Sequence, residues 1–233
     1  MGSQATERAR ASRRWRRAAL ILGTIVLSFG CSPLNTLSFL MPGDTRTPPE
    51  CPLVTKEKKE VKIVVIASST GLDPRPETYG AEQDLAERLI QVLKKSFAED
   101  REKVTFVPNY QVRSYQNKTT TAQTPYEVGK HFQADRVINL EVGPISLYKD
   151  GSARQLFFGR IELSLTCTDM SKPREEGPVY RQEYIQEYPR SGEIAADGSN
   201  PAFFRARFLD YVARDLGHFF TPFDEVDRKM GRE

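Results

Sequence analysis

The chain has 233 residues, enough for one medium-sized domain, and its 39% hydrophobic content with 13 Phe and 9 Tyr is sufficient for a buried core. Its net charge of +3 is unevenly placed, because residues 1–30 hold six arginines and a single acid and so carry +5. The remaining 28 basic and 30 acidic residues give −2, which excludes nucleic acid as the expected partner of the folded part, since phosphate binding needs a concentrated basic surface.

The first 31 residues have the organisation of an export signal. An arginine-rich stretch precedes the uncharged apolar segment 18–29, whose 12 residues fit the hydrophobic region of a signal peptide. A membrane-spanning helix needs about 20 apolar residues, so this segment is short for one. Gly30-Cys31 follows and resembles the lipobox of bacterial lipoproteins, in which the cysteine is acylated and becomes the new amino terminus. Ser28 and Phe29 depart from that pattern, which has an aliphatic and then a small residue there.

Three interpretations of this segment stay open. In the first, the signal is cleaved and Cys31 carries the lipid; in the second, the segment is an uncleaved anchor that continues through residues 34–41; in the third, cleavage releases a soluble protein. The first two predict membrane lipid as a partner, through Cys31 or through the apolar segment 18–29. We expect a location in a bacterial cell envelope, membrane-anchored, with the arginines on the cytoplasmic side and the domain facing the periplasm or the exterior.

The chain beyond the signal segment (1–31) divides into three parts. Residues 32–60 are predicted to form a tether, because five prolines are followed by the charged run 56–60. A domain is predicted at 61–222 and a charged tail at 223–233. Apolar patterns within the domain predict strands at 61–67, 104–108, 136–148, 156–168 and 179–188, and helices at 81–100, 125–132 and 201–219.

The strand patterns change along the domain. The run 61–67 is apolar throughout, as in a parallel strand buried on both faces, whereas 156–168 alternates apolar and polar residues, as in an antiparallel strand with one solvated face. We therefore predict an α/β (α+β) fold with a single mixed β-sheet of about five strands, in the order βαβαβ and then antiparallel strands, with packed helices and a long C-terminal helix.

The long C-terminal helix has clear signals at its start and along one face. Asn200 is predicted to be its N-cap, with Pro201 at the first helical position. Apolar residues then recur at intervals of three or four, which predicts a stripe that covers the sheet. The stripe consists of Phe204, Phe208, Val212, Leu216 and Phe219.

The loop 68–80 is the first candidate for a ligand site. It follows the first strand, at the edge where open α/β sheets bind ligands, and Ser68, Ser69, Thr70 and Gly71 could contact a phosphate. It lacks the G-x-x-x-x-G-K-[ST] and G-x-G-x-x-G phosphate-binding patterns. An ordinary crossover loop is the alternative interpretation.

The sequence offers few residues for catalysis or metal binding. The two histidines, His131 and His218, have carboxylates at helical spacing but no second histidine or cysteine beside them, so surface or partly packed histidines are expected and no metal site is predicted. No G-x-S-x-G nucleophile elbow is present. We therefore predict that the protein is not an enzyme and has no cofactor; a small-ligand binder or an enzyme using the loop 68–80 is the alternative.

Two further sets of residues have two interpretations each. If the cysteine at the end of the signal is acylated, Cys51 and Cys167 are left as a candidate disulfide in an oxidising compartment. Alternatively, Cys167, in the buried phase of its strand, acts as a small hydrophobic residue. Tyr180, Tyr184 and Tyr188 share one face of the strand 179–188, and they form either a partner surface or a sheet face under the last helix.

The order of these segments resembles that of small bacterial envelope lipoproteins. The residues that carry the resemblance are Gly30-Cys31-Ser32, VKIVVIA, DLAERLIQVLKKSF, ADRVINLEVGPISLY and FLDYVARDLGHFF. A strand, a helix with Leu-Ala-Glu-x-Leu, a short strand and then Ala-Asp-x-Val-Ile are similar to the amino-terminal domain of the Tol-Pal translocation protein, and to curli-secretion and penicillin-binding-protein-activator lipoproteins, over about residues 61–188. The resemblance implies a non-catalytic assembly, scaffolding or protein-binding module whose partner is another envelope protein.

Overall fold

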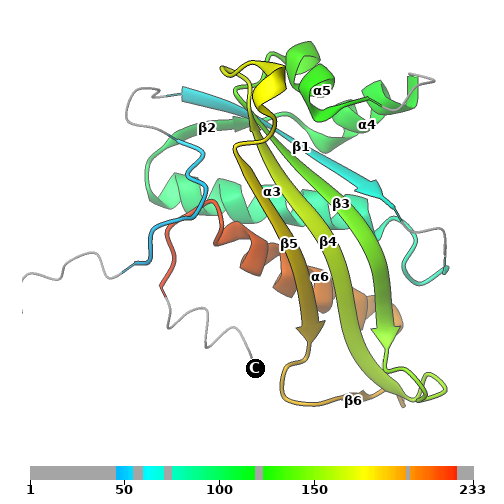
Figure 1. Cartoon of the computed structure of the whole chain (residues 1–233). Coiled ribbons are helices and arrows are strands. Elements are labelled where there is room, and N and C mark those ends of the chain that lie inside the picture. The colour runs from blue at the N-terminus through cyan, green and yellow to red at the C-terminus, as the bar shows by residue number, and fades with distance from the viewer. Residues whose placement is uncertain (1–45, 55–59, 71–74, 119–122, 198–199, 225–233) are drawn as a thin grey trace, which may run out of the picture. The chain divides into compact units, whose positions relative to one another are not determined.

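One mixed β-sheet runs through the part of the chain that the structure describes, which comprises residues 46–54, 60–70, 75–118, 123–197 and 200–224 (Figure 1). The structure is a computed structural model. The sheet order is β2-β1-β3-β4-β5, with β6 paired to the start of β4. This arrangement confirms the predicted mixed sheet with packed helices and a long C-terminal helix. The elements in chain order are β1 (Glu60–Ser69), α3 (Ala81–Glu99), β2 (Lys103–Phe106), α4 (Asn109–Lys118), α5 (Pro125–Phe132), β3 (Arg136–Tyr148), β4 (Leu156–Asp169), η1 (Arg174–Glu176), β5 (Tyr180–Tyr188), β6 (Ile194–Ala195) and α6 (Pro201–Gly217).

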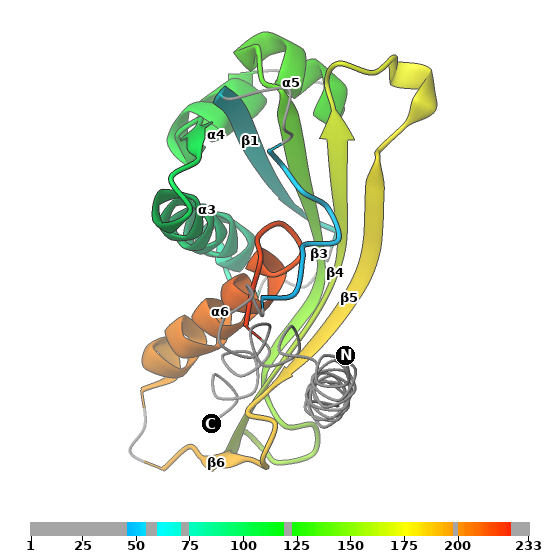
Figure 2. The same cartoon turned by 90° about the vertical axis from the view of Figure 1, so that its left-hand side faces the viewer.

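The first half of the sheet is parallel and is covered on both faces. β1 pairs in parallel with β2 and with β3. Ile63 and Val65 face the main core under α3 and α6, which lie together on one side of the sheet (Figure 2), whereas Val64 and Ile66 face a smaller cluster with residues of α4 and α5. Burial on both faces explains why the strand is apolar at successive positions.

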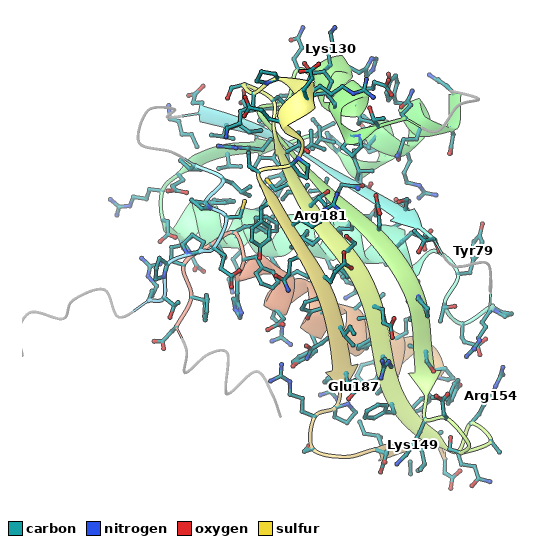
Figure 3. The ribbon with its side chains drawn as sticks, viewed as in Figure 1. Tyr79, Lys130, Lys149, Arg154, Arg181 and Glu187 are labelled. Atoms are coloured by element: carbon teal, nitrogen blue, oxygen red, sulfur yellow. The ribbon has the colours of Figure 1, made fainter. Side chains whose placement is uncertain are left out.

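The second half of the sheet is antiparallel and has one solvated face. β4 pairs in antiparallel fashion with β3 and with β5. Its alternation places Leu163 and Leu165 in the core, and Arg160 on the opposite face, where it pairs with Glu162 (2.9 Å) and Glu187 (3.0 Å). We call this opposite face the polar face. Figure 3 labels two of its side chains, Arg181 and Glu187. It carries Arg160, Glu162, Ser164, Arg181, Glu183, Ile185 and Glu187.

The helix α6 begins where the sequence predicts and packs its apolar stripe on the sheet. The side chain of Asn200 accepts a hydrogen bond from the backbone N–H of Ala202 (2.9 Å), which confirms the predicted N-cap. Phe204, Phe208, Val212 and Leu216 are all buried. Phe219 lies beyond the end of the helix at Gly217 and is half-buried against the core. The stripe therefore covers the sheet, as expected, over its first four members.

The predicted limits of the tether and the domain are wrong at both ends of the domain. Residues 46–54 pack on it: Leu53 is 1% exposed, the N–H of Cys51 donates to the carbonyl of Phe219 (2.8 Å), and Thr47 forms a bridge with Phe223. The prolines of this segment suit an extended chain, but its apolar side chains gain free energy by leaving water. The domain thus includes 46–54 and extends to residue 224. Residues 1–45, with Cys31 and the signal segment, and residues 55–59 and 225–233 lie outside the described residues.

Three elements, α4, β6 and the short 3-10 helix η1, are not among the sequence-based predictions. The helix α4 buries a single apolar side chain, Val112, so its apolar periodicity is weak. It is attached to α3 by Asn109, whose amide donates to the carbonyl of Gln83 (3.4 Å). β6 has two residues, too few to produce a strand pattern.

Candidate functional site

The described polar residues at the start of the predicted ligand loop, Ser68, Ser69 and Thr70, do not line the hollow beside it. Ser68 and Ser69 are exposed at the end of β1, and both the N–H and the hydroxyl of Thr70 donate to the carbonyl of Val142 (2.8 and 3.3 Å). Gly71 lies outside the described residues. A hollow of about 500 Å³ lies beside the start of α3, but Ser68, Ser69 and Thr70 do not line it. Its lining consists of Tyr79, Gly80, Glu82, Gln83, Asp84, Arg113, Gln116 and Asn117.

The charges at the start of α3 oppose a phosphate ligand. A helix N-terminus attracts anions, but the first turn of α3 already holds two carboxylates, Glu82 and Asp84. Asp84 pairs with Arg205 (2.6 Å), so an arginine that could bind a phosphate is already engaged there. The two acids stabilise the start of α3, and the described residues there give no support for a phosphate site.

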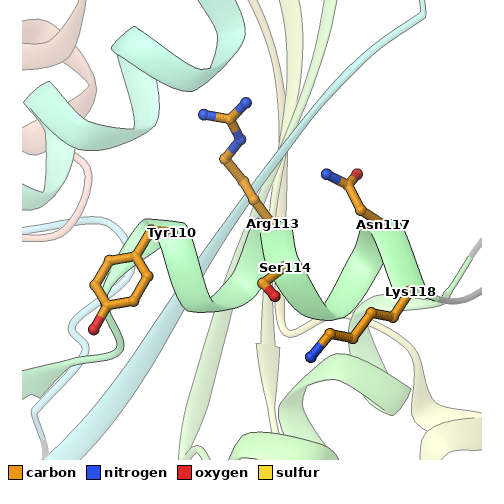
Figure 4. Close-up of a pocket in the computed structure, with 5 residues that line it drawn as sticks. All are labelled: Tyr110, Arg113, Ser114, Asn117 and Lys118. Carbon is orange, nitrogen blue, oxygen red and sulfur yellow. The ribbon is translucent and has the colours of Figure 1, made fainter.

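A shallow hollow on α4 is the solvated face of a single helix. Tyr110, Arg113, Ser114, Asn117 and Lys118 line about 400 Å³ and recur at intervals of three and four, so they share one side of α4 (Figure 4). All five are exposed, and no second element contributes to this lining. A helix face of this kind is ordinary polar surface.

A larger cleft of about 720 Å³ lies where the C-terminal ends of α3 and α6 meet both ends of the described domain. We call it the α3–α6 cleft. Its basic and acidic side chains balance, with Arg46, Lys95 and Arg214 opposite Glu99, Asp215 and Asp224, so it has no strong preference for a charged ligand. The other lining residues are Val92, Ser96, Tyr211, His218, Thr221, Pro222 and Phe223.

Two residues that line the α3–α6 cleft, Tyr211 and Asp215, form hydrogen bonds that join α6 to the sheet. The hydroxyl of Tyr184 donates to Oδ2 of the buried Asp215 (2.9 Å), and the hydroxyl of Tyr211 is 2.7 Å from the side-chain amide of Gln186. His218 places Nδ1 3.9 Å from Oδ1 of Asp215, beyond the roughly 2.6–3.2 Å at which an acid and a base exchange a proton. The arrangement therefore holds β5 against α6 and leaves Asp215 hydrogen-bonded to a tyrosine.

Burial raises the pKa of Tyr184 far above its ordinary value, and the neighbouring carboxylate of Asp215 raises this pKa further. Above about pH 10 the unfolded chain releases this phenol proton, whereas the folded protein keeps it. The unfolded state then binds fewer protons than the folded state, so the free energy of unfolding falls as pH rises. Below about pH 10 the contribution of Tyr184 to stability is complete.

We expect the Tyr184→Phe variant to lose less stability in alkali than the wild type. The free energy of unfolding of both, measured by urea denaturation from about pH 9 to about pH 11, should differ in slope by up to about 1.4 kcal/mol per pH unit. Tyr110→Phe, which changes a 69% exposed tyrosine on α4, is the matched control and should keep the wild-type slope. Equal slopes for the wild type and Tyr184→Phe would contradict this account of the buried phenol.

The three tyrosines on one face of β5 differ in burial. Tyr184 and Tyr188 are each 7% exposed and belong to the main core with α6, so the partner-surface interpretation is wrong for these two residues. Tyr180 is half-buried, and its hydroxyl donates to Glu50 of the packed N-terminal segment (2.8 Å). The strand face under the last helix is therefore the correct alternative for the buried pair.

The two candidate disulfide partners lie together in the core. Cys51 and Cys167 are buried free thiols that hydrogen-bond to each other, one from the segment 46–54 and one from β4. This hydrogen bond and burial raise the pKa of the Cys167 thiol. Cys167, at 0% exposure, fills the core as a small hydrophobic residue does. The disulfide stays a prediction.

Neither histidine belongs to a metal site within the part of the chain that the structure describes. The ring of His131 stacks on Tyr115 of α4 (3.7 Å between centroids), and that of His218 stacks on Phe223 (4.5 Å). Across residues 46–54, 60–70, 75–118, 123–197 and 200–224, no three His, Cys, Asp or Glu side chains are grouped as metal ligands would be. Over the same ranges, no helix has both the length and the apolar character to cross a membrane.

No protein-family model matches this chain, and no curated protein matches it. Solved structures do resemble it. The PelC dodecamer from Paraburkholderia phytofirmans is 9% identical, with a TM-score of 0.40 over 72% of this chain and 96% of that one. Lipoprotein GNA1162 from Neisseria meningitidis is 12% identical, with a TM-score of 0.38 over 67% and 97% of the two chains. Protein XCC0632 from Xanthomonas campestris is 14% identical, with a TM-score of 0.39 over 73% and 86%.

These identities and TM-scores assign neither a family nor a function to the chain. One of the three similar proteins is named a lipoprotein, and none of the three is a Tol-Pal protein. The resemblance to the Tol-Pal translocation protein therefore stays a prediction.

Proposed function

We propose that this chain is an exported lipoprotein of the bacterial envelope whose domain binds another envelope protein and catalyses no reaction. One observation carries the proposal. A packed domain begins at Arg46, only 15 positions after Cys31, the lipobox-like cysteine that closes an arginine-rich apolar segment. Export followed by attachment close to the membrane is the simplest use of that order of segments.

Acylation of Cys31 suits the length of the apolar segment. Its 12 residues are too few to span the bilayer comfortably, since about 20 are needed, whereas acyl chains anchor a protein without a spanning helix. Stable anchoring takes two such signals, and lipoprotein cysteines carry more than one chain.

We expect Cys31→Ala to move the full-length protein from the membrane to the soluble fraction or to the uncleaved precursor. Membrane fractionation of the expressing bacteria and the intact mass of the purified protein measure this. Ser32→Ala, one position further along the same segment, is the matched control and should stay in the membrane fraction with its mass changed only by the substitution. Unchanged fractionation and no lost acyl mass in Cys31→Ala would reject lipidation and favour an uncleaved anchor.

The polar face supports protein binding. No helix among the described residues covers the antiparallel half of the sheet on this side, and the ion pairs of Arg160 with Glu162 and Glu187 lie there beside Ile185, which is 59% exposed. Charged pairs around an exposed apolar side chain suit specific recognition of another protein.

A photo-crosslinking residue placed at Glu162 in the full-length protein tests this role. We expect it to capture one defined envelope protein in living bacteria, identified by mass spectrometry, while the same residue at Lys130 on α5 captures none. Identical products from the two positions would mean that the polar face is not the binding surface.

The alternative function, a small-ligand binder or an enzyme, is favoured by the α3–α6 cleft and not by the loop 68–80. A compound that raises the melting temperature of the wild type but not that of Arg214→Ala would support this alternative, because Arg214 lines the cleft and ligand binding stabilises the folded state.

A further inference from the structure

The strand β5 forms an outer edge of the sheet. In the sheet order it pairs with β4 on one side, and on its other side no described segment forms a backbone hydrogen bond with it. It is nine residues long and contains no proline. Long edge strands without protection pair readily with another strand, because their outward N–H and C=O groups are unsatisfied by protein.

The sequence of β5 is complementary to itself in antiparallel orientation. A two-fold axis through Tyr184 places that residue opposite its own copy, and the other residues, apart from Glu183 and Ile185, meet an identical residue or one of opposite charge. Arg181 faces Glu187, and by symmetry the interface contains this ion pair twice. The remaining opposed pairs are Tyr180 with Tyr188, Gln182 with Gln186, and Glu183 with Ile185.

Neighbouring registers lack this match. An axis through Ile185 sets Glu183 opposite Glu187, and an axis through Glu183 sets that residue opposite its own copy. Like charges directly opposite each other destabilise a strand pair, so one register is selected.

The side chains of β5 on the polar face have the positions and the exposure that this pairing needs. Arg181 and Glu187 project from β5 on the same face, toward its two ends (Figure 3). Arg181 is exposed and makes no ion pair within the described residues, while Glu187 already accepts a hydrogen bond from Arg160 (3.0 Å). The pairing also makes the two copies of Ile185 diagonal neighbours across the strands, which covers a side chain that is 59% exposed in the single chain.

We propose that two copies of this chain associate through antiparallel pairing of β5 with β5, which joins their sheets into one. The partner of this surface is a second copy of the chain, because the strand is complementary to itself in charge and in length. The proposal does not depend on the proposed function, whose partner is a different protein.

Charge reversal with mixing tests the proposal. Full-length chains with two different affinity tags are co-expressed and purified in a large excess of detergent, and the recovery of one tag with the other is measured. We expect the wild type to co-purify with itself, and Arg181→Glu or Glu187→Arg each to weaken self-association about tenfold, because each change turns two attractive pairs into repulsive ones. When Arg181→Glu is co-expressed with Glu187→Arg, every opposed pair is again one arginine and one glutamate, and co-purification should return.

Lys130→Glu is the matched control, since it makes the same change of charge at an exposed site on α5, away from β5 (Figure 3). It should self-associate as the wild type does. Circular dichroism melting of each variant shows that it is folded. The proposal is overturned if the wild type does not self-associate, if the single reversals associate as well as the wild type, or if the mixture fails to recover. A captured partner at Glu162 in the crosslinking experiment is a separate result and decides only the proposed function.

Discussion

Replacing Phe208 with alanine is expected to lower the free energy of unfolding by about 3–5 kcal/mol, the usual cost of removing a buried phenylalanine side chain. Phe208 is 0% exposed, and its ring packs on Gly159 of β4 and near the ring of Tyr188, the partner of Gly159 on β5, 6.3 Å away between centroids. The strands on this side are held by their ladders and cannot move in to fill the space, so a cavity is left. Since a domain has roughly 5–15 kcal/mol of stability, the loss is a large share of it.

Urea denaturation of the full chain in detergent, followed by circular dichroism, measures this loss. Phe203→Ala is the matched control, because Phe203 is on the same helix and is 64% exposed, and its cost should stay within about 0.5 kcal/mol. A loss below about 1 kcal/mol for Phe208→Ala would remove α6 from the core and make it a candidate docking element.

The second large effect is expected at Gly159, where the sheet has no room for a side chain. A Cβ atom built at this position would lie 2.8 Å from two atoms of the Phe208 ring, closer than side chains normally approach. Because the ring is packed on all sides, Gly159→Ala should cost about 1–3 kcal/mol of stability, as overpacking of a well-filled core does.

The same substitution should be almost without cost once the ring is gone. In the Phe208→Ala background the added methyl group enters the space that the ring has left, so the two changes together should destabilise the protein by about 1–3 kcal/mol less than the sum of their separate costs. The four proteins of this double-mutant cycle are compared by urea denaturation. Costs that simply add would mean that the ring of Phe208 does not rest on Gly159.

The strands of the sheet could be predicted from the sequence, because the pattern of apolar residues in each one reflects how many of its faces are buried. Uninterrupted apolar residues around Ile63 to Ile66 correspond to a strand with a packed layer on each face, and the alternation along β4 corresponds to a strand with one solvated face. The helix α4 could not be predicted from such patterns. Its contact with α3, from Asn109 to Gln83, joins positions 26 apart and leaves no periodic signal in the sequence. The packing of the N-terminal segment 46–54 could not be predicted either, because its two buried side chains, Cys51 and Leu53, lie among prolines that are typical of a tether.

The α3–α6 cleft could not be predicted for a similar reason. Its lining comes from the segment before β1, from α3, from α6 and from the residues after α6, and the hydrogen bond between Tyr184 and Asp215 joins positions 31 apart. The spacing of Asp215 and His218 was the only local signal, and it is common on solvated helix faces. The position of the loop 68–80 after β1 is typical of ligand loops, but among its described residues Ser68, Ser69 and Thr70 do not line the hollow at the start of α3.

If Cys31 carries a lipid, as proposed, the packing of residues 46–54 on the domain shortens the chain that joins the domain to this anchor. A tether of residues 32–60 would extend at most about 100 Å, at roughly 3.3–3.6 Å per residue, whereas the 14 residues that separate Cys31 from Arg46 extend at most about 50 Å. A domain with its lipid on Cys31 therefore works within a thin layer beside the membrane that holds it. A partner of the polar face would then have to reach the membrane to within about that distance and the width of the domain itself.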